Sequence, residues 1–275
     1  MMLIVALSLL AAPVGPLEVS RRGGPANAVP WSALALKEQS LFDVQAGALV
    51  TVRGVPLEAL LAKGPARKGE DTALLHFMNG MIVPVPLDAK GEPVIDVFIA
   101  HERRREDGVF LRSFPPVVHE RSPWMEQRAI VFGDNKVVVS QADHPALAPT
   151  NTKFSPWAHV DSLKRVELVR AEVIHAALDV SPELNIRRGL MVFEQRCQFC
   201  HGVAGKGASF GWDFVEPIPL STWRDPESLL YHVKMTRLEA AERGLMMPPQ
   251  PDVTLEEMKH LWAWMNVVGK KPRKP

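Results

Sequence analysis

The sequence is poor in cysteine, because its 275 residues include only two, Cys197 and Cys200. Two thiols cannot staple a disulfide-rich fold or supply a site that needs a third thiolate. A charge surplus is also lacking, since 32 Lys and Arg residues face 31 Asp and Glu residues. Such a chain has no overall field to attract nucleic acid or an anionic membrane. We therefore expect no nucleic-acid partner.

The chain also lacks an apolar run of the roughly 20 residues that a transmembrane helix needs. A shorter run, Leu3–Ala12, lies near the N-terminus and is followed by Pro13, Gly15 and Pro16. It suits a secretory signal over residues 1–15, although no Lys or Arg precedes it. A buried strand or an uncleaved anchor are the alternatives. We expect an exported, periplasmic protein. If the signal is cleaved, the mature protein is not transmembrane; if the signal is not cleaved, the N-terminus tethers the protein to the membrane.

Residues 16–178 have the pattern of a mainly β domain. Short runs rich in Val, Ile, Phe and Thr alternate with Gly, Pro, Asn and Asp clusters, which predicts strands joined by turns. One short helix is expected at Pro56–Leu61. The expected strands are Leu49–Val52, Gly80–Val85, Val94–Ile99, Gly108–Phe114, Ala129–Phe132, Lys136–Val139 and Lys164–Val169.

Residues 179–275 have a helical pattern instead, so the predicted fold class is α+β with two domains. Ser181 and Pro182 suit the N-cap and first position of a helix. The Asp225-Pro226 pair likewise opens a second helix, expected from Glu227 to about Ala241. Thr254 and Glu257 have the spacing of a capping box. The apolar stripes of the first and last helices contain Ile186, Leu190, Phe193 and Cys197, and Met258, Leu261, Trp262, Met265 and Val268.

The two cysteines stand in the string Cys197-Gln198-Phe199-Cys200-His201. In a C-x-x-C-H sequence the thiols form thioethers with the two vinyl groups of haem, and the histidine becomes the proximal iron ligand. A thioredoxin-like reading would need a βαβ context and no following histidine. A zinc half-site would need two further ligands, and no second C-x-x-C or H-x-H pair exists. The string predicts one covalent haem c.

A second axial ligand is expected from Gly244–Pro249, a loop just before the last helix. Met247 precedes Pro248, which restricts the backbone so that the loop can hold a thioether over the iron. Met246 is the spare candidate, and His232 on the middle helix is an alternative that would lower the potential. Ordinary core packing of the two methionines is the competing interpretation. The remaining histidines show no ligand spacing, and we expect them at the surface or hydrogen-bonded.

Residues from about Pro182 to Val268 resemble a class I c-type cytochrome. The resemblance lies in Gly189 and Phe193 before the motif, the Gly-rich turn after His201, the Met247-Pro248 loop and Trp264. It implies close crossing of the first and last helices, with Gly189 and Phe193 against Trp264. It also implies that a backbone carbonyl near Pro217 or Pro219 holds the second ring nitrogen of the histidine.

The N-terminal part weakly resembles the molybdopterin-binding oxidoreductase-like fold of sulfite-oxidase relatives. The similar segments are Leu49–Gly64, His76–Leu87, Phe98–Ala100 and Trp157–Val169. That family holds molybdenum through a cysteine thiolate, and both cysteines here are needed for haem. Even the fold resemblance therefore implies no standard molybdenum site.

The function expected is single-electron transfer through a His/Met-ligated haem, to or from a redox protein such as an oxidoreductase or a terminal electron acceptor. The alternative is a haem enzyme or a gas or redox sensor with a labile sixth ligand. A third hypothesis gives catalysis to the N-terminal domain, with the haem as its electron outlet. Residues 16–170 contain no recognisable catalytic constellation.

Overall fold

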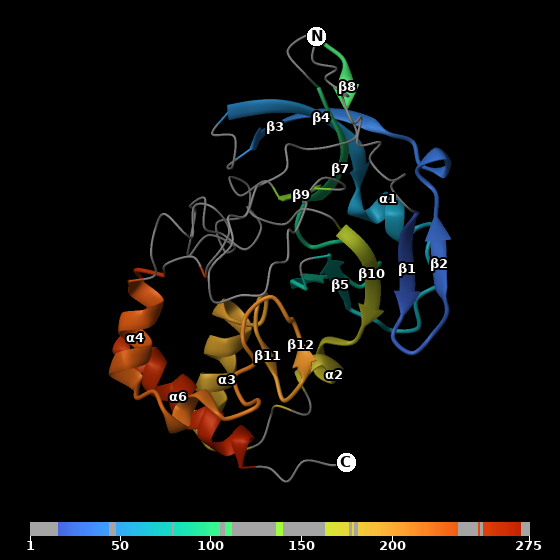
Figure 1. Ribbon diagram of the computed structural model, residues 1–275. Helices are drawn as coiled ribbons and strands as arrows, with labels where there is room; N and C mark the ends of the chain where they lie inside the picture. Colours follow the sequence, from blue (N-terminus) through green and yellow to red (C-terminus); the bar gives the residue numbers. More distant parts are fainter. Residues whose placement is uncertain are drawn as a thin grey trace, which may run out of the picture.

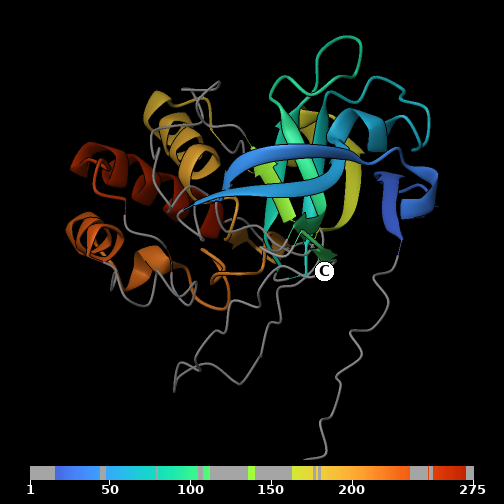
Figure 2. The same cartoon turned by 90° about the horizontal axis from the view of Figure 1, so that it is seen from above.

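A computed structural model describes residues 16–43, 48–78, 80–104, 108–111, 136–139, 163–175, 178, 181–235, 247 and 250–270. The two five-stranded sheets lie in the N-terminal part, and the three longer helices follow in the C-terminal part (Figure 1). Seen from above, these sheets and the three longer helices occupy opposite sides of the molecule (Figure 2). We call residues 17–169 the β region and residues 184–269 the helical region. The combination confirms the α+β class.

The first sheet of the β region has the strand order β2-β1-β10-β5-β6. The first strand of the chain, β1, pairs with β10, and these two strands run parallel. The other neighbouring pairs of this sheet are antiparallel. Val19, Leu75, Val83 and Val166 are fully buried and contribute to a core beneath this sheet. The bounds are β1 Leu17–Arg21, β2 Ala26–Val29, β5 Thr72–Phe77, β6 Ile82–Pro86 and β10 Leu163–Val169.

The second sheet has the order β3-β4-β7-β8, and β9 also pairs with β7. Helix α1 (Leu57–Leu61) directly follows β4 and buries Leu57 and Leu60 in the same core as the first sheet. The strands are β3 Lys37–Asp43, β4 Ala48–Pro56, β7 Val97–Arg104, β8 Phe110–Leu111 and β9 Lys136–Val139, and a 3-10 helix, η1, spans Trp31–Ala33.

The helical region is capped as its sequence predicts at two of its helices. Asp225 accepts a hydrogen bond from the Ser228 amide at the start of α4, and the capping box of Thr254 and Glu257 begins α6. Short helix α2 precedes this region. The bounds are α2 Ala171–His175, α3 Leu184–Arg196, β11 Gly202–Val203, β12 Lys206–Gly207, η3 Leu220–Thr222, α4 Pro226–Lys234 and α6 Leu255–Gly269.

Helices α3 and α6 cross closely at Gly189, as the resemblance implied. A β-carbon at this position would lie 2.1 Å from the His260 carbonyl oxygen and 2.5 Å from the Trp264 β-carbon. Only glycine lets the two backbones approach this far. Phe193 lies against Trp264, with 5.0 Å between ring centroids, and the fully buried Trp264 is the largest side chain of this core. The crossing fixes the end of α3, from which the C-x-x-C-H segment continues.

Several predicted boundaries are wrong. Helix α3 begins at Leu184 and not at Pro182, because Glu183 keeps an extended backbone and is the N-cap, although the Glu183 amide donates to the Ser181 hydroxyl at 3.2 Å. Strand β6 begins at Ile82, since Gly80 with φ +89° forms the turn before it. Helix α4 ends at Lys234 with Met235 as its C-cap, short of the expected Ala241. Residues 1–15, 112–114, 129–132, 157–162 and 236–241 lie outside the described part. None of the described helices is both long and apolar enough to cross a membrane.

Candidate functional site

The C-x-x-C-H segment forms the final turn of α3. Cys197 is the C-cap of the helix, with its amide donating to the Phe193 carbonyl at 2.8 Å. The amides of Cys200 and His201 both donate to the Cys197 carbonyl, at 3.1 and 3.0 Å. A single compact turn therefore carries two free, partly buried thiols and one imidazole.

Burial holds both thiols in their protonated form. It raises the pKa of Cys197, with a smaller contribution from Cys200, to about 12, and it raises the pKa of Cys200 to about 12. Thioredoxin-like chemistry and zinc binding both require thiolates, which proteins favour by lowering the pKa. Among the described residues no group of three His, Cys, Asp or Glu side chains is placed to hold a metal ion. The surroundings therefore oppose the thioredoxin-like interpretation of the motif, which needs a stabilised thiolate.

The ring of His201 is held by a backbone carbonyl. Its Nδ1 lies 2.7 Å from the carbonyl oxygen of Trp212. Because a carbonyl can only accept, Nδ1 carries the proton and Nε2 keeps a free lone pair. Burial also lowers the pKa of His201, which favours the neutral, ligating form. The expected carbonyl near Pro217 or Pro219 is thus wrong, and Trp212 takes this role.

Asp213 explains why the Trp212 carbonyl faces the histidine. Its carboxylate accepts from the amides of Ala204, Gly205, Val215 and Glu216 at 2.7 to 3.0 Å. Four charge-assisted hydrogen bonds draw both ends of this loop onto one side chain. The β11–β12 turn fits the same arrangement, with positive φ at Ala204 and Gly205. The loop that presents Trp212 is therefore tightly fixed, although the sequence signalled only a Gly-rich turn.

Gly211 lies against the face of the His201 ring. A β-carbon there would be 2.4, 2.6 and 2.9 Å from ring atoms Cε1, Nδ1 and Nε2. We expect Gly211→Ala to displace the ring, break its bond to Trp212 and destabilise the protein by about 1–3 kcal/mol, as overpacking does. Denaturant unfolding measures the loss, and the absorption spectrum of bound haem reports the histidine. Gly24→Ala, whose β-carbon approaches nothing closer than 3.4 Å, is the control; an equal effect there would contradict this role of Gly211.

The position of Met247 follows from that of Gln250, while Met246 lies outside the described residues. Met247 is partly buried. Three residues later, the Gln250 amide donates to the Val233 carbonyl at 3.0 Å, and its side chain donates to the Arg196 carbonyl at 3.4 Å. Three extended residues span at most about 11 Å. Met247 is therefore confined to the space near α4 and the end of α3.

Arg196 joins the C-x-x-C-H segment to the start of α6. Its guanidinium lies 2.9 Å from Asp252 and 3.0 Å from Glu257. Burial alone would lower the pKa of Arg196, but the two carboxylates outweigh it and the pKa is raised. This ion pair ties the residue next to Cys197 to the segment that follows Met247. We call the three side chains the Arg196 clamp.

Replacing Arg196 by alanine should cost about 2 kcal/mol of unfolding free energy, because hydrogen bonds between charged and partly buried groups are lost. Chemical denaturation of the full chain measures this cost. Arg188 on the same helix is the matched control, since it pairs with Glu256 at 3.9 Å with both side chains well exposed. Its alanine variant should change stability by less than about 0.5 kcal/mol. Equal losses in both variants would contradict the special position of Arg196.

The clamp also predicts a dependence on acid. Burial would raise the pKa of Glu257, but hydrogen bonds from Thr254 and the charge of Arg196 lower it below the ordinary 4.5. A lowered carboxyl pKa gives stability that is complete above the unfolded-state pKa and is lost as the pH falls through the folded-state value. Arg196→Ala should therefore weaken the fall of stability below about pH 4.5. Unchanged acid dependence would contradict the electrostatic part of the clamp.

Four other histidines have defined surroundings. His101 stacks on Trp31 with 4.0 Å between ring centroids, and His260 lies 3.5 Å from Glu256. His232 projects from α4 and is exposed, and its charge is close enough to lower the pKa of His201 further. His76 pairs with Glu167 at 3.1 Å on the first sheet, as expected for a hydrogen-bonded histidine. His119, His144 and His159 lie outside the described residues.

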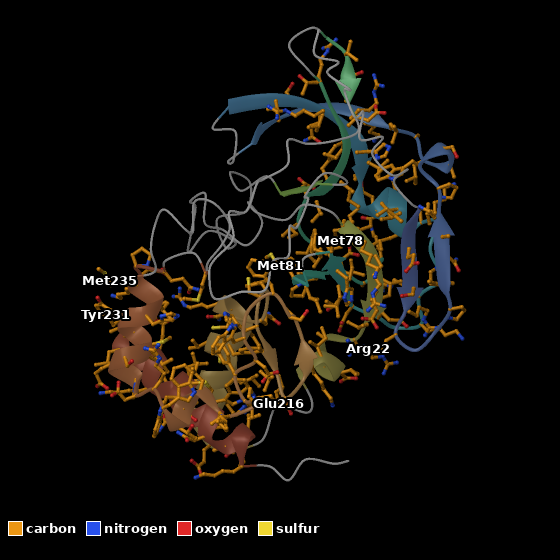
Figure 3. All side chains as sticks on the ribbon, in the orientation of Figure 1. Arg22, Met78, Met81, Glu216, Tyr231 and Met235 are labelled. Carbon is orange, nitrogen blue, oxygen red and sulfur yellow. The ribbon has the colours of Figure 1, made fainter. Side chains whose placement is uncertain are left out.

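The donor set fits a haem c. Two protonated thiols, a neutral imidazole with a free Nε2 and a nearby thioether are the groups that such a haem binds. Large apolar side chains of the helical region are also exposed: Trp212 at 72%, Trp223 at 52%, Tyr231 at 69% and Met235 at 63%. Tyr231 and Met235 project from the end of α4 (Figure 3).

A comparison with protein families agrees with this geometry. The family model described as cytochrome C oxidase, cbb3-type, subunit III matches residues 184–265. No curated protein matches the chain. The matched segment runs from the start of α3 into the last turns of α6 and contains the C-x-x-C-H string and Met247. The helical region is therefore a c-type cytochrome domain, which indicates a haem-based electron-transfer function, while the match leaves out the β region.

Proposed function

We propose that this protein is an exported single-haem electron carrier. Cys197 and Cys200 bind the haem covalently, His201 is the proximal axial ligand and Met247 is the distal ligand. The bound haem supplies reversible one-electron chemistry of its iron. The observation that carries the proposal is the His201 ring, fixed by Trp212 with Nε2 free directly after the two thiols.

The chain's own residues have three tasks in this function. Trp212 and Gly211 orient the imidazole. The Arg196 clamp holds the segment after Met247 close to the thiols. The buried Phe214, whose ring centroid lies 5.0 Å from that of His201, shields the imidazole from water, which supports a higher potential together with a thioether ligand.

Spectroelectrochemical titration of the purified full chain tests the proposal. We expect one Nernstian transition of a single electron, with one haem per chain. The matched family is named for a subunit of an oxidase, and we propose an oxidoreductase or a terminal electron acceptor as the redox partner. Protein without a redox-active haem, or with two transitions, would contradict the proposed carrier.

Location and domain division belong to the same proposal. Covalent haem attachment of this type takes place outside the cytoplasm, so residues 1–15 act as a signal or a tether. Residues 16–178 form the β domain and residues 179–275 the cytochrome domain. The resemblance of the β domain to the molybdopterin-binding fold concerns architecture alone. Because both cysteines bind the haem in this proposal, none is left for molybdenum. We propose that the β domain positions the haem and binds no molybdenum through cysteine.

A further inference from the structure

The turn between β5 and β6 contacts the C-x-x-C segment through its backbone. The Ile82 amide donates to the Phe199 carbonyl at 3.1 Å, and the Ser209 amide donates to the Gly80 carbonyl at 2.9 Å. Met78 and Met81 flank this turn, on the side of the β region nearest to the helical region (Figure 3). Two reciprocal hydrogen bonds thus join a turn of one region to the functional segment of the other.

The side chains of the motif divide between two cores. Phe199 and Cys200 pack against the core of the β region, whereas Cys197 packs against the core of the helical region. Phe210, which follows Ser209, also packs against the β core. The second thiol of the motif therefore lies at the junction, with apolar groups of the β region beside it.

Glycine is required on the β side of this junction. Gly80 has φ +89°, and a β-carbon there would lie 2.5 Å from the Ser209 hydroxyl oxygen and 3.2 Å from the Phe210 amide nitrogen. A side chain at residue 80 would push the loop away from the turn. The β5–β6 turn and the Ser209–Phe210 segment therefore lie too close together to leave room for a side chain at residue 80.

We propose that the β5–β6 turn is a fixed wall of the haem site, which covers the edge attached to Cys200 and excludes water and redox partners from it. This inference rests on the proposed attachment of haem at Cys197 and Cys200. A covered edge is less solvated, which favours a higher reduction potential. The redox partner must then approach the haem away from the β5–β6 turn.

Two pairs of variants in the haem-loaded full chain test this wall. Phe199→Ala removes the packing against the β region. Its control is Gln198→Ala, the other variable position of the motif, whose side chain bonds the Glu194 carbonyl within α3. Gly80→Ala disturbs the turn without touching the motif, so it remains informative if Phe199→Ala matures poorly. Its control is Gly23→Ala, which carries similar backbone strain at φ +74° with no neighbour within 4 Å.

Three measurements are made on each variant: hydrogen exchange of the Ile82 and Ser209 amides, the reduction potential, and the rate of reduction by a small hydrophilic reductant. We expect Phe199→Ala and Gly80→Ala to show faster exchange at both amides, a lower potential and several-fold faster reduction. Both controls should match the wild type. Haem-loaded variants that all match the wild type would overturn the wall and leave the proposed function intact. Wild-type protein without covalent haem would overturn the function itself.

Discussion

Replacing Cys197 or Cys200 by alanine is expected to leave at most one thioether bond to the haem and to reduce the yield of mature protein severely. Both thiols are available for this bond, because they are free and lie in a single turn fixed by hydrogen bonds to the Cys197 carbonyl. No other cysteine exists in the chain to replace either one. The double variant should bind no haem covalently.

The measurement is haem retention after denaturation under reducing conditions. Wild-type protein should keep its colour on a denaturing gel and during acid–organic extraction, whereas the double variant should lose it. Gln198→Ala is the matched control, because it changes the motif without removing a thiol and should retain haem. Extraction of the haem from intact wild-type protein would contradict covalent attachment at these positions.

The parts of the fold that local sequence predicts are the helix ends and the apolar stripes. Asp225 and Thr254 have short side chains that reach their own helix, so their capping depends on neighbouring residues alone. Ser181 accepts from the amide two residues later, as an N-cap does, but Glu183 keeps an extended backbone and the helix begins only at Leu184. The pattern therefore predicts the local hydrogen bond and misses the first helical residue.

The strands that sequence reasoning missed depend on distant partners. Strand β1 pairs in parallel with β10, more than a hundred residues later along the chain. Strand β5 lies between β10 and β6, and its register comes from both neighbours. Strand propensity depends strongly on such packing, so short strands like these carry little signal of their own.

The candidate site likewise has one part that local sequence predicts and another that depends on residues elsewhere in the chain. The C-x-x-C-H string predicts its donors because their spacing is local. The carbonyl that orients His201 comes from Trp212, and nothing near Pro217 or Pro219 takes its place. Asp213 determines that choice by gathering four amides, and a lone Asp in a loop has no distinctive signature. The contact of Phe199 with the β region also lies beyond any local pattern.

Met247 decides between the electron carrier and the alternative, a haem enzyme or sensor with a labile sixth ligand. With its thioether on the iron, both oxidation states should be six-coordinate and low-spin, and reduced protein should bind carbon monoxide poorly. The anchoring of Gln250 to Arg196 and Val233 keeps Met247 within reach of this position.

Met247→Ala is therefore expected to open the sixth position. Axial ligands set haem potentials over a range of roughly 0.8 V, so a fall on the order of 0.1 V is reasonable for loss of the thioether. Redox titration measures the fall, and absorption and magnetic resonance spectra should show high-spin iron with ready binding of carbon monoxide. Met246→Ala is the matched control and should leave the spin state and potential nearly unchanged, because its neighbour supplies the sulfur.

Two results would shift the assignment. If Met246→Ala rather than Met247→Ala opens the site, the spare candidate is the ligand and the carrier function stands. If neither variant changes the spectrum, His232→Ala tests the remaining candidate, whose charge acts on His201 from helix α4. Wild-type protein that is already high-spin and binds carbon monoxide rapidly would instead favour the enzyme or sensor, since a thioether bound to the iron should prevent both.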